Sequence, residues 1–445
     1  MSLWGSLSRV TVQGIEEVRL TAFKSFRNQV LPLAPLTTLI GRNSSGKSNA
    51  LDGLEVLSRL ARGDDITEAL ESRRGPEGAV RGGLAGCVPH GSDRFALGCT
   101  VRTQWGPIDL EVTVQVEPEV QIIKERLTGP TAEGRRHVLE SGEANPQVGD
   151  LWATWHNGKR GRDPSVRFRG SRLLTSQLPL RVAPETQGGT DSVWCAETMI
   201  STLEGVFHLD PVPHLMRQYV PSRDSNLRRT AENLSAAVGN IERTDKPLFR
   251  RLVELLRGLA DHEIETLAVT RSDLGDVMIA LNEGPLGLTP AREMSDGMLR
   301  FLAITTSLLT GGGGLDLGHT KAEQNERSLM LVIEELENGL HPSQASEVLG
   351  LVRQAGAANS TEVLITTHSP ALLSALDAED HDGVVVCWRD RESGSSRLTR
   401  LTELDGYPTA MASGSLGEVV TQGRLDTSPR RDRDYSEFDR LLGIG

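Results

Sequence analysis

Hydrophobic and polar positions near the start of the chain predict a strand, a glycine-rich loop and a helix in direct succession. Residues 15–23 and 36–40 have the apolar content of β-strands, and the second run leads straight into Gly41. Residues 49–61 are predicted to form a helix. Its apolar residues are spaced to share one face and are Ala50, Leu51, Leu54, Leu57 and Ala61.

The rest of the chain shows the same two kinds of pattern. Alternating or continuous apolar runs predict strands at residues 95–101, 108–116, 264–282 (two short strands), 329–333, 362–367 and 383–388. Helical spacing predicts helices at residues 226–260, 292–309, 342–354 and 372–376. Residues 130–190 are rich in Gly, Pro, Arg and Ser, and we expect loops of an inserted region there. We also expect a loop at 311–328 and a charged tail from 423 that ends in a short helix.

The glycine-rich loop matches the GxxxxGK[ST] pattern that binds nucleoside phosphates. Its residues are Gly41, Arg42, Asn43, Ser44, Ser45, Gly46, Lys47 and Ser48, followed by Asn49. Glycines let the backbone curl so that its N–H groups and the helix N-terminus face an anion. Lys47 is placed to reach the β- and γ-phosphates and Ser48 to bind Mg²⁺. Because a strand precedes the loop and a helix follows it, we predict an ATP and Mg²⁺ site rather than a chance glycine-rich loop.

Two later elements suit phosphoryl transfer. The strand at 329–333 ends in Glu334 and Glu335. The first carboxylate can hold Mg²⁺ and the second can polarise an attacking water. His368 follows the next strand and can hydrogen-bond a γ-phosphate. Taken alone, the acids can form a solvated turn and the histidine can be structural, so the catalytic interpretation depends on the phosphate loop.

A third element precedes the helix at 292–309. Ser295 can cap this helix, and the helix N-terminus can bind an anion. Spacing alone favours a plain helix cap over a functional role. The residues concerned are Ser295, Asp296, Gly297 and Met298.

In this order, the motifs resemble the ABC-type ATPase heads of the RecF, SMC and OLD group, and most closely the compact bacterial AAA-family ATPases found in anti-phage defence. Residues 20–26 (LTAFKSF) resemble the group's first strand. Residues 333–342 (IEELENGLHP) resemble its acidic block, with Leu336 in place of the usual proline. Residues 295–298 stand at its signature motif, and further similar features are residues 207–213 and Asn233-Leu234. The likeness covers residues 15–130 and 200–420.

The resemblance implies a fold, a mechanism and partners. The fold would be α/β: a mixed sheet with a phosphate-loop core, an antiparallel β subdomain and an inserted helical lobe. The halves of the head would span residues 1–125 and 263–420, around a lobe at 126–262 and before a tail at 421–445. Two heads would dimerise head-to-tail, so that Ser295 and Gly297 of one copy reach ATP held by the other. Glu334 would assist Mg²⁺, Glu335 would position water, His368 would sense the γ-phosphate, and residues 337–341 would lie at the dimer contact. Neither Gln115 nor Gln121 is identified as the group's Q-loop glutamine.

Several features limit the class of protein. No sustained heptads occur between Ser48 and Ser295, which excludes a long coiled-coil arm. Only 77 residues follow His368, too few for a Toprim nuclease domain, so we expect no intrinsic nuclease and a separately encoded nuclease or Toprim-like effector. An acidic cluster in this segment is interpreted as a solvated turn rather than a metal site and contains Asp377, Glu379, Asp380 and Asp382.

Composition and charge bear on location and partners. Four dispersed cysteines and the absence of a signal peptide or an ~18-residue apolar run predict a cytoplasmic protein without a membrane segment. The net charge of −12 disfavours nucleic acid unless a local basic patch exists. Residues 151–185 carry such a stretch, which is equally well explained as exposed loop. Its candidates for DNA contact are Arg160, Arg167, Arg169 and Arg172.

Three functions remain open at this point. The first is an ATP-hydrolysing subunit that acts on DNA or on an effector, most plausibly in anti-phage defence. The second is a RecF-like repair ATPase that binds DNA at gaps or ends. The third is a scaffold that binds ATP without hydrolysing it, which Glu335 and His368 disfavour.

Overall fold

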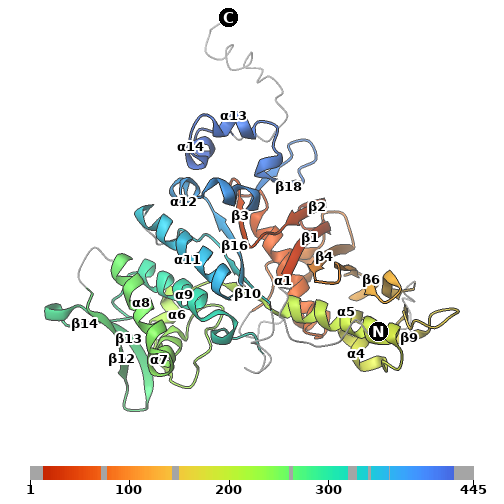
Figure 1. Cartoon of the computed structure of the whole chain (residues 1–445), viewed down its shortest axis with the longest axis horizontal. Helices are drawn as coiled ribbons and strands as arrows, with labels where there is room; N and C mark the ends of the chain where they lie inside the picture. Colours follow the sequence, from red (N-terminus) through yellow and green to blue (C-terminus); the bar gives the residue numbers. More distant parts are fainter. Residues whose placement is uncertain are drawn as a thin grey trace, which may run out of the picture.

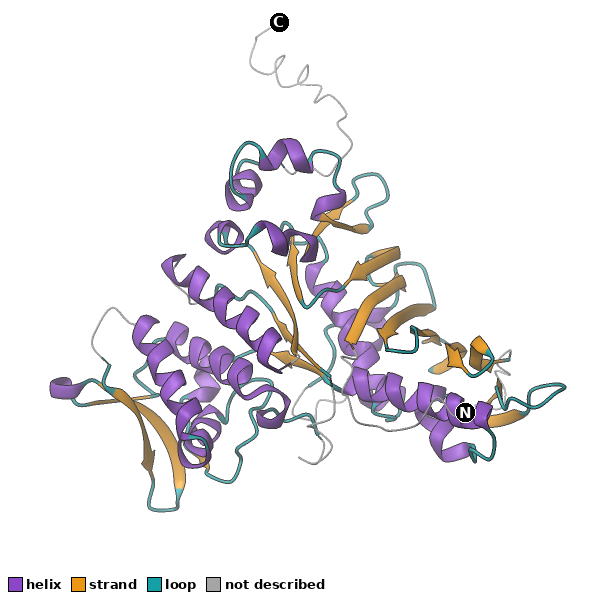
Figure 2. Ribbon diagram, in the orientation of Figure 1, coloured by secondary structure: helices purple, strands orange, loops and turns teal. Residues whose placement is uncertain are grey.

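The computed structural model describes residues 14–71, 78–142, 150–259, 264–318, 328–338, 342–359 and 361–424. Most of the strands belong to one long sheet that runs from a parallel end to an antiparallel end, and a smaller sheet lies with its own helices to one side (Figures 1 and 2). The candidate chemistry lies at the parallel end of the long sheet.

The parallel end consists of buried strands. Their spatial order is β10 (Val206–Leu209), β15 (Leu329–Ile333), β16 (Thr361–Thr367), β3 (Leu36–Ile40) and β17 (Val384–Arg389). Every residue of β15 and β16 is buried, as expected for parallel strands covered on both faces. The flanking helices are α1 (Lys47–Ala61), α11 (Ala345–Asn359) and α12 (Pro370–Ser374).

The antiparallel end continues the same sheet. Its strands in spatial order are β18 (Ser396–Arg400), β2 (Phe26–Pro32), β1 (Gly14–Phe23), β4 (Arg94–Arg102), β5 (Ile108–Gln115), β6 (Gln121–Thr131), β7 (Gly134–Ser141), β8 (Asp150–Trp155) and β9 (Ser165–Arg169). Helices α4 (Leu174–Arg181) and α5 (Gln187–Glu204) pack on one face of its outer strands. The opposite face of these strands is open to solvent at several positions.

The prediction of loops at residues 130–190 is therefore wrong. This segment contains β7, β8, β9 and α4, together with the start of α5. The predicted boundary at 125/126 also falls inside β6, so the segment extends the sheet instead of beginning a separate lobe. The signal is weak because these strands are short and bury only one or two residues each, while β7 and β9 carry exposed arginines that resemble loop composition.

The smaller sheet forms the second part of the molecule. It contains β11 (Val220–Pro221), β12 (Thr266–Arg271), β13 (Asp276–Asn282) and β14 (Leu288–Pro290). Its helices are α6 (Pro213–Met216), α7 (Leu234–Thr244), α8 (Lys246–Leu259) and α9 (Asp296–Thr310). These helices belong to a hydrophobic core that also receives side chains from β15 and β16. The second part is therefore packed directly against the parallel end of the long sheet.

Short helices complete the fold. They are α2 (Ile66–Glu71), α3 (Gly83–Cys87), α13 (Tyr407–Met411) and α14 (Leu416–Thr421). The observed elements agree in type, within a few residues, with the strands predicted at 15–23, 36–40, 95–101, 108–116, 264–282, 329–333, 362–367 and 383–388 and the helices predicted at 49–61, 292–309, 342–354 and 372–376. The helix predicted at 226–260 begins only at Leu234 and is divided into α7 and α8. The predicted loop at 311–328 lies partly, and the helix at the end of the tail wholly, outside the described residues.

The structure confirms the predicted α/β class with its parallel core and antiparallel extension. The longest described helix, α5, has 18 residues, so no coiled-coil arm occurs in the part of the chain that the structure covers. Among the described residues, no helix has the length and apolar character needed to cross a membrane.

Candidate functional site

The glycine-rich loop joins β3 to α1 and is braced by two neighbouring strands. The Ser396 hydroxyl of β18 donates to the Ser45 carbonyl at 2.6 Å, and the Cys387 thiol of β17 approaches the same oxygen at 3.4 Å. Gly46 has a φ of +117°, and a Cβ there would lie 2.4 Å from Ser396 Oγ. Only glycine fits so close to β18 with that backbone, which is why the loop can curl here.

A hydrogen-bonded chain of small polar residues connects this loop to the first hairpin. Asn49 Nδ2 donates to Ser25 Oγ at 2.9 Å, and Ser25 Oγ lies 2.7 Å from Ser396 Oγ. Sequence reasoning placed Ser25 only in a family-like strand and missed Ser396. No signal in the sequence alone brings these residues together, because they are 371 positions apart.

The Lys47 side chain lies against the backbone of the glycine-rich loop. Its ammonium group donates to the carbonyl oxygens of Gly41 at 2.9 Å and Arg42 at 3.2 Å. Burial lowers the pKa of Lys47, while the nearby carboxylates of Glu335 and Glu337 oppose this shift. The cation is therefore held where an anion cradled by the loop would meet it.

Glu334 and Ser48 meet across the end of the sheet. The Ser48 hydroxyl donates to Glu334 Oε2 at 3.1 Å. A serine hydroxyl beside a carboxylate offers the hard oxygen ligands that Mg²⁺ prefers. The pair therefore fits the predicted metal, and the assignment of Ser48 and Glu334 as its ligands stays a prediction.

Arg81 is a neighbour of this pair that the sequence did not reveal. Its guanidinium binds both carboxylate oxygens of Glu334, with Nη2 to Oε1 at 2.5 Å and Nη1 to Oε2 at 3.2 Å, and its Nε donates to Asp52 at 2.9 Å. Although burial opposes it, these hydrogen bonds and charges raise the pKa of Arg81 above its ordinary value. Lys24 also donates to Asp52, at 2.8 Å.

Glu335 follows Glu334 in a constrained backbone conformation. Its φ is +48°, a region that residues other than glycine rarely occupy, and its N–H donates to Thr366 Oγ1 of β16 at 2.8 Å. Asn338 Nδ2 donates to Glu335 Oε2 at 2.5 Å. Glu335 lines one cleft together with Arg42 and Asn43 of the loop. Backbone strain of this kind often accompanies functional geometry.

His368 completes an open cleft beside the loop. The residues that line this cleft are Arg42, Asn43, Glu335, Glu337, Asn338 and His368. Burial, together with the positive charge of Lys47, lowers the pKa of His368, so the ring is mostly neutral at neutral pH. Its backbone N–H also donates to the Glu337 carboxylate. A neutral imidazole here can donate one hydrogen bond to an oxyanion.

The predicted signature residues lie elsewhere. Ser295 caps α9 by accepting a hydrogen bond from Met298 N at 3.2 Å, and none of the residues from Ser295 to Met298 lines the cleft. Arg217 fixes this segment, because its Nη2 donates to Met294 O at 2.8 Å and to Asp296 Oδ1 at 2.7 Å. Ser295 and Asp296 are exposed. The structure thus separates the two halves of the predicted ATP site.

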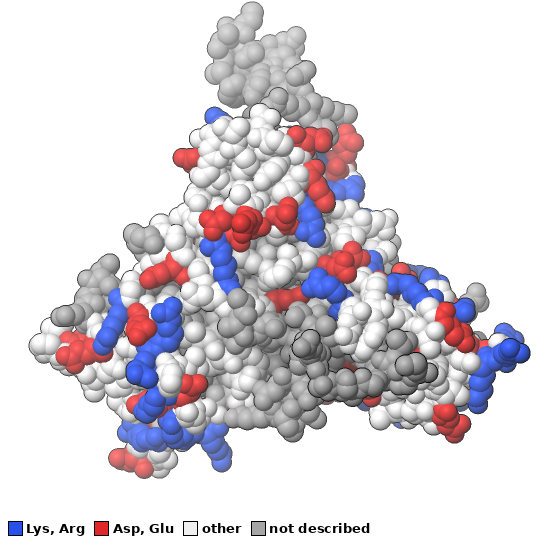
Figure 3. All heavy atoms as spheres, in the orientation of Figure 1, with Lys and Arg blue, Asp and Glu red and all other residues white. Residues whose placement is uncertain are grey.

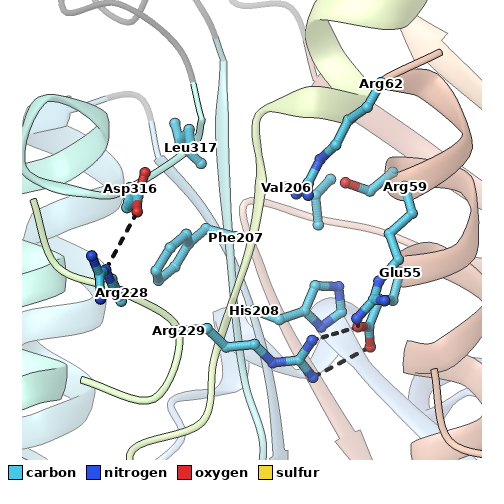
Figure 4. A pocket seen from close by; sticks show the side chains of 11 residues that line it. Glu55, Arg59, Arg62, Val206, Phe207, His208, Arg228, Arg229, Asp316 and Leu317 are labelled. Atoms are coloured by element: carbon cyan, nitrogen blue, oxygen red, sulfur yellow. Dashed lines mark hydrogen bonds and ion pairs between the residues drawn. The ribbon is translucent and has the colours of Figure 1, made fainter. Parts of the chain in front are cut away.

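A buried ion pair connects the loop's helix to the second part of the molecule. Glu55 of α1 binds Arg59 one turn later and Arg229 on the segment that leads from β10 toward α7. Figure 4 shows Arg229 and His208 pointing toward the Glu55 carboxylate. Burial alone would raise the pKa of Glu55, but the positive charges around it prevail and lower the pKa to about 2. Glu55 therefore stays ionised and couples α1 to this segment.

Other candidates from the sequence have structural roles or stand apart. Asp377 and Asp380 form a capping box at residues 377–380 and both pair with Arg353. Gln115 and Gln121 face each other across β5 and β6, away from the cleft. Of the predicted dimer-contact segment, residues 339–341 lie outside the described residues.

The sequence matches the protein family described as "AAA domain, putative AbiEii toxin, Type IV TA system" at residues 36–103 and 153–374, about two thirds of the chain. This chain belongs to that AAA domain family. The match contains the glycine-rich loop, the signature segment, both acids and His368. It omits residues 104–152, which hold β5, β6, β7 and the first half of β8. The family-level resemblance drawn from the motifs is confirmed, and membership identifies the AAA domain as an ATPase of this type.

Solved structures with a similar fold include SMC heads. One is an SMC head bound to the C-winged helix domain of ScpA, at 12% identity over 87% of this chain and 97% of that chain, with a TM-score of 0.47. A head with an extended coiled coil, bound to the C-terminal domain of ScpA derived from Pyrococcus furiosus, has 11% identity, 87% and 96% coverage and a TM-score of 0.45. The SMC head domain from Thermotoga maritima has 11% identity, 87% and 98% coverage and a TM-score of 0.39. No curated protein matches this chain.

Proposed function

We propose that this protein hydrolyses ATP at a site shared by two copies and passes the result to a separately encoded effector. One observation carries the proposal. Arg42 and Asn43 of the loop line one cleft with Glu335 and His368, while the segment at Ser295 is exposed and does not line that cleft. A second copy in head-to-tail contact would supply Ser295 and Gly297 to the cleft.

Each residue of the candidate site has its own role in the proposed hydrolysis of ATP. The loop N–H groups and Lys47 bind and orient the phosphates. Ser48 and Glu334 would hold Mg²⁺, which when bound would neutralise charge on the phosphates. Glu335 is placed to accept a proton from a water at the open side of the cleft. His368 donates to the terminal phosphate, and the opposing Ser295 hydroxyl and helix N-terminus complete its coordination.

The shared-site proposal is tested by the mass of the Glu335→Gln variant in light scattering, with and without Mg²⁺-ATP. We expect a monomer without nucleotide and a dimer with it, because the variant binds ATP but removes the water-activating carboxylate. Adding Ser295→Arg to this variant should restore the monomer, since a bulky cation would block the opposing cleft. A monomer of Glu335→Gln under both conditions would remove the dimer proposal.

Hydrolysis itself separates the ATPase from a scaffold that only binds ATP. Phosphate release from the unsubstituted protein in a single-turnover assay, absent in Glu335→Gln, is the expected result. Equal absence of release in both proteins, with ATP bound, would favour the scaffold. The family description names a putative toxin of a toxin–antitoxin system. This supports an output delivered through another component, in anti-phage defence as the motif resemblance implies.

A further inference from the structure

The solvent-exposed face of β8 and β9 carries a large aromatic ring beside basic side chains. Trp152 of β8 is 58% exposed, an unusual state for an indole in the middle of a strand. It lies directly opposite Arg167 of β9 in the strand register, and Asp150 lies opposite Arg169. Residues opposite each other on one face are cross-strand neighbours, so the side chains of Trp152 and Arg167 leave the sheet at adjacent positions.

The same row of the sheet continues toward β6. Gly142, just beyond β7, donates from its N–H to the Trp152 carbonyl at 2.8 Å. Arg126 pairs with Glu140 in the register, and extending that register by two residues places Lys124 opposite Gly142. Lys124, Gly142, Trp152 and Arg167 thus form one row across the four strands. Because Gly142 has no side chain, this row is flat beside the indole. Three inter-strand steps of ~4.8 Å make it about 14 Å long.

The charges of this region are opposite in sign to those of the whole chain. Between Asp150 and Arg172 there are six Lys or Arg residues and two acids, in a chain with a net charge of −12. Arg167 is paired with Asp150. Among the residues that the structure describes, Lys124 and Arg169 have no ion-pair partner. Figure 3 shows basic side chains gathered at the end of the molecule where β9 lies in Figure 1.

The four arginines expected to contact DNA do not all lie on the same surface. Arg167 and Arg169 alternate with buried Phe168 and point to the exposed face of β9. Arg160 lies in the turn that joins β8 to β9, and Arg172 is half-buried in the turn before α4. Arg167 lies in the row with Trp152, and Arg169 lies two residues further along β9 on the same face.

We propose that Lys124, Trp152, Arg167 and Arg169 form a surface that binds single-stranded nucleic acid, with one base stacked on the Trp152 indole and the basic groups on flanking phosphates. An exposed π-face between cations recognises unpaired bases, whose faces are free, and not the stacked bases of a duplex. Lys124 and Trp152 lie in the segment that the family match omits, whereas Arg167 and Arg169 lie inside the matched range. The inference goes beyond the proposed ATPase function and does not rest on it.

The test uses the full-length protein without nucleotide and measures fluorescence anisotropy of labelled 20-nucleotide oligo-dT, oligo-U and a 20-base-pair duplex. We expect both single strands to bind more tightly than the duplex. Trp152→Ala should weaken single-strand binding about 5- to 100-fold, the range for loss of one stacked base, while Trp152→Phe should retain most of it. Binding should quench tryptophan emission in the unsubstituted protein and much less in Trp152→Phe.

The basic groups are tested by salt dependence. Arg169→Gln and Lys124→Gln should each reduce the slope of log affinity against log salt by about 0.7, the value for one phosphate contact on a single strand. Arg271→Gln is the matched control, because Arg271 is equally exposed but lies on β12 of the smaller sheet, and its slope should equal that of the unsubstituted protein.

Two outcomes would overturn the proposal. One is tight single-strand binding that Trp152→Ala leaves unchanged. The other comes from competition, in which poly-glutamate displaces oligo-dT equally well from the unsubstituted protein and from Trp152→Ala. That result would identify a surface that recognises only charge and that binds an acidic protein. Circular dichroism melting of each variant separates loss of binding from loss of folding.

Discussion

Arg81 holds Glu334 through two hydrogen bonds, of 2.5 Å and 3.2 Å, at the place where Glu334 also meets the Ser48 hydroxyl. The Arg81 guanidinium therefore binds the same carboxylate that the proposed mechanism assigns as a ligand of Mg²⁺. Charge-assisted bidentate pairs are among the stronger polar contacts in proteins. Metal binding at Glu334 would have to compete with Arg81.

Replacing Arg81 by alanine should accordingly strengthen metal binding. We expect the Mg²⁺ concentration that half-saturates binding of a fluorescent ATP analogue to fall about 10-fold or more, the equivalent of one charge-assisted contact. Asp52 keeps Lys24 as a partner, so the variant should fold. Arg81→Lys keeps the positive charge but loses the two-pronged hydrogen bonding to Glu334, so its half-saturating Mg²⁺ concentration should be intermediate. An unchanged Mg²⁺ requirement in Arg81→Ala would show that Arg81 does not compete with metal.

Gly46→Ala should abolish nucleotide binding with only a moderate loss of stability. The new methyl group would meet Ser396 Oγ at 2.4 Å with a backbone φ of +117°, so the loop must shift. Strain of this kind costs about 1–3 kcal/mol. The measurements are nucleotide affinity by calorimetry and the free energy of unfolding in urea.

Gly350→Ala provides the control for that substitution. Gly350 lies within α11, and a Cβ there would meet nothing within 4 Å. Alanine should leave nucleotide affinity unchanged and stabilise the helix by up to about 1 kcal/mol. Retained nucleotide binding in Gly46→Ala would contradict the close fit of the loop against β18.

Arg217→Ala should weaken the proposed dimer without affecting ATP binding to the monomer. It releases the Met294 carbonyl and the Asp296 carboxylate, so the exposed segment at Ser295 loses its fixed position. In the Glu335→Gln background we expect ATP-dependent dimerisation to weaken about 5-fold or more, as for a lost charged hydrogen bond. Sedimentation at several protein concentrations measures this. Arg250→Ala, on the exposed side of α8, should have no effect.

Glu55→Gln should destabilise the whole protein. It leaves Arg59 and Arg229 beside a neutral amide in a largely buried place, where loss of a buried partner costs about 3 kcal/mol. Urea unfolding followed by circular dichroism gives the free energy. Glu254→Gln, which breaks an exposed pair with Arg251, should change it by less than about 0.5 kcal/mol.

The same residue predicts a pH dependence. Glu55 has a pKa of about 2 in the folded protein against 4.5 as its ordinary value. The folded state therefore binds fewer protons between these values, and the stabilisation from Glu55 is complete above pH 4.5 and lost as the pH falls toward 2. The difference in unfolding free energy between the unsubstituted protein and Glu55→Gln should shrink over that window. A difference that stays constant from pH 6 to pH 3 would assign the effect to packing and not to charge.

The antiparallel end of the long sheet contains strands that the sequence pattern does not predict. Regular alternation predicts strands at β4 and β5, whereas the composition of β8 and β9 predicts loop although their buried and exposed residues also alternate in part. Their buried residues, Leu151, Ala153 and Phe168, are few and lie among arginines and glycines. Strands this short are stabilised by pairing with β7 and packing on the helices, contacts that local composition does not encode.

The sequence by itself determined the glycine-rich loop, the two acids after β15, His368 and the parallel core, because each depends on local spacing and on a continuous apolar run. Only the tertiary structure decided what surrounds them. Arg81 and Ser396 reach the candidate site from distant parts of the chain, and Arg217 fixes the Ser295 segment in the same way. No local pattern distinguishes these residues from other polar residues. It also decided that the Ser295 segment stands apart from the cleft. That separation depends on how the smaller sheet packs against the larger one, which is a property of long-range contacts and not of any motif.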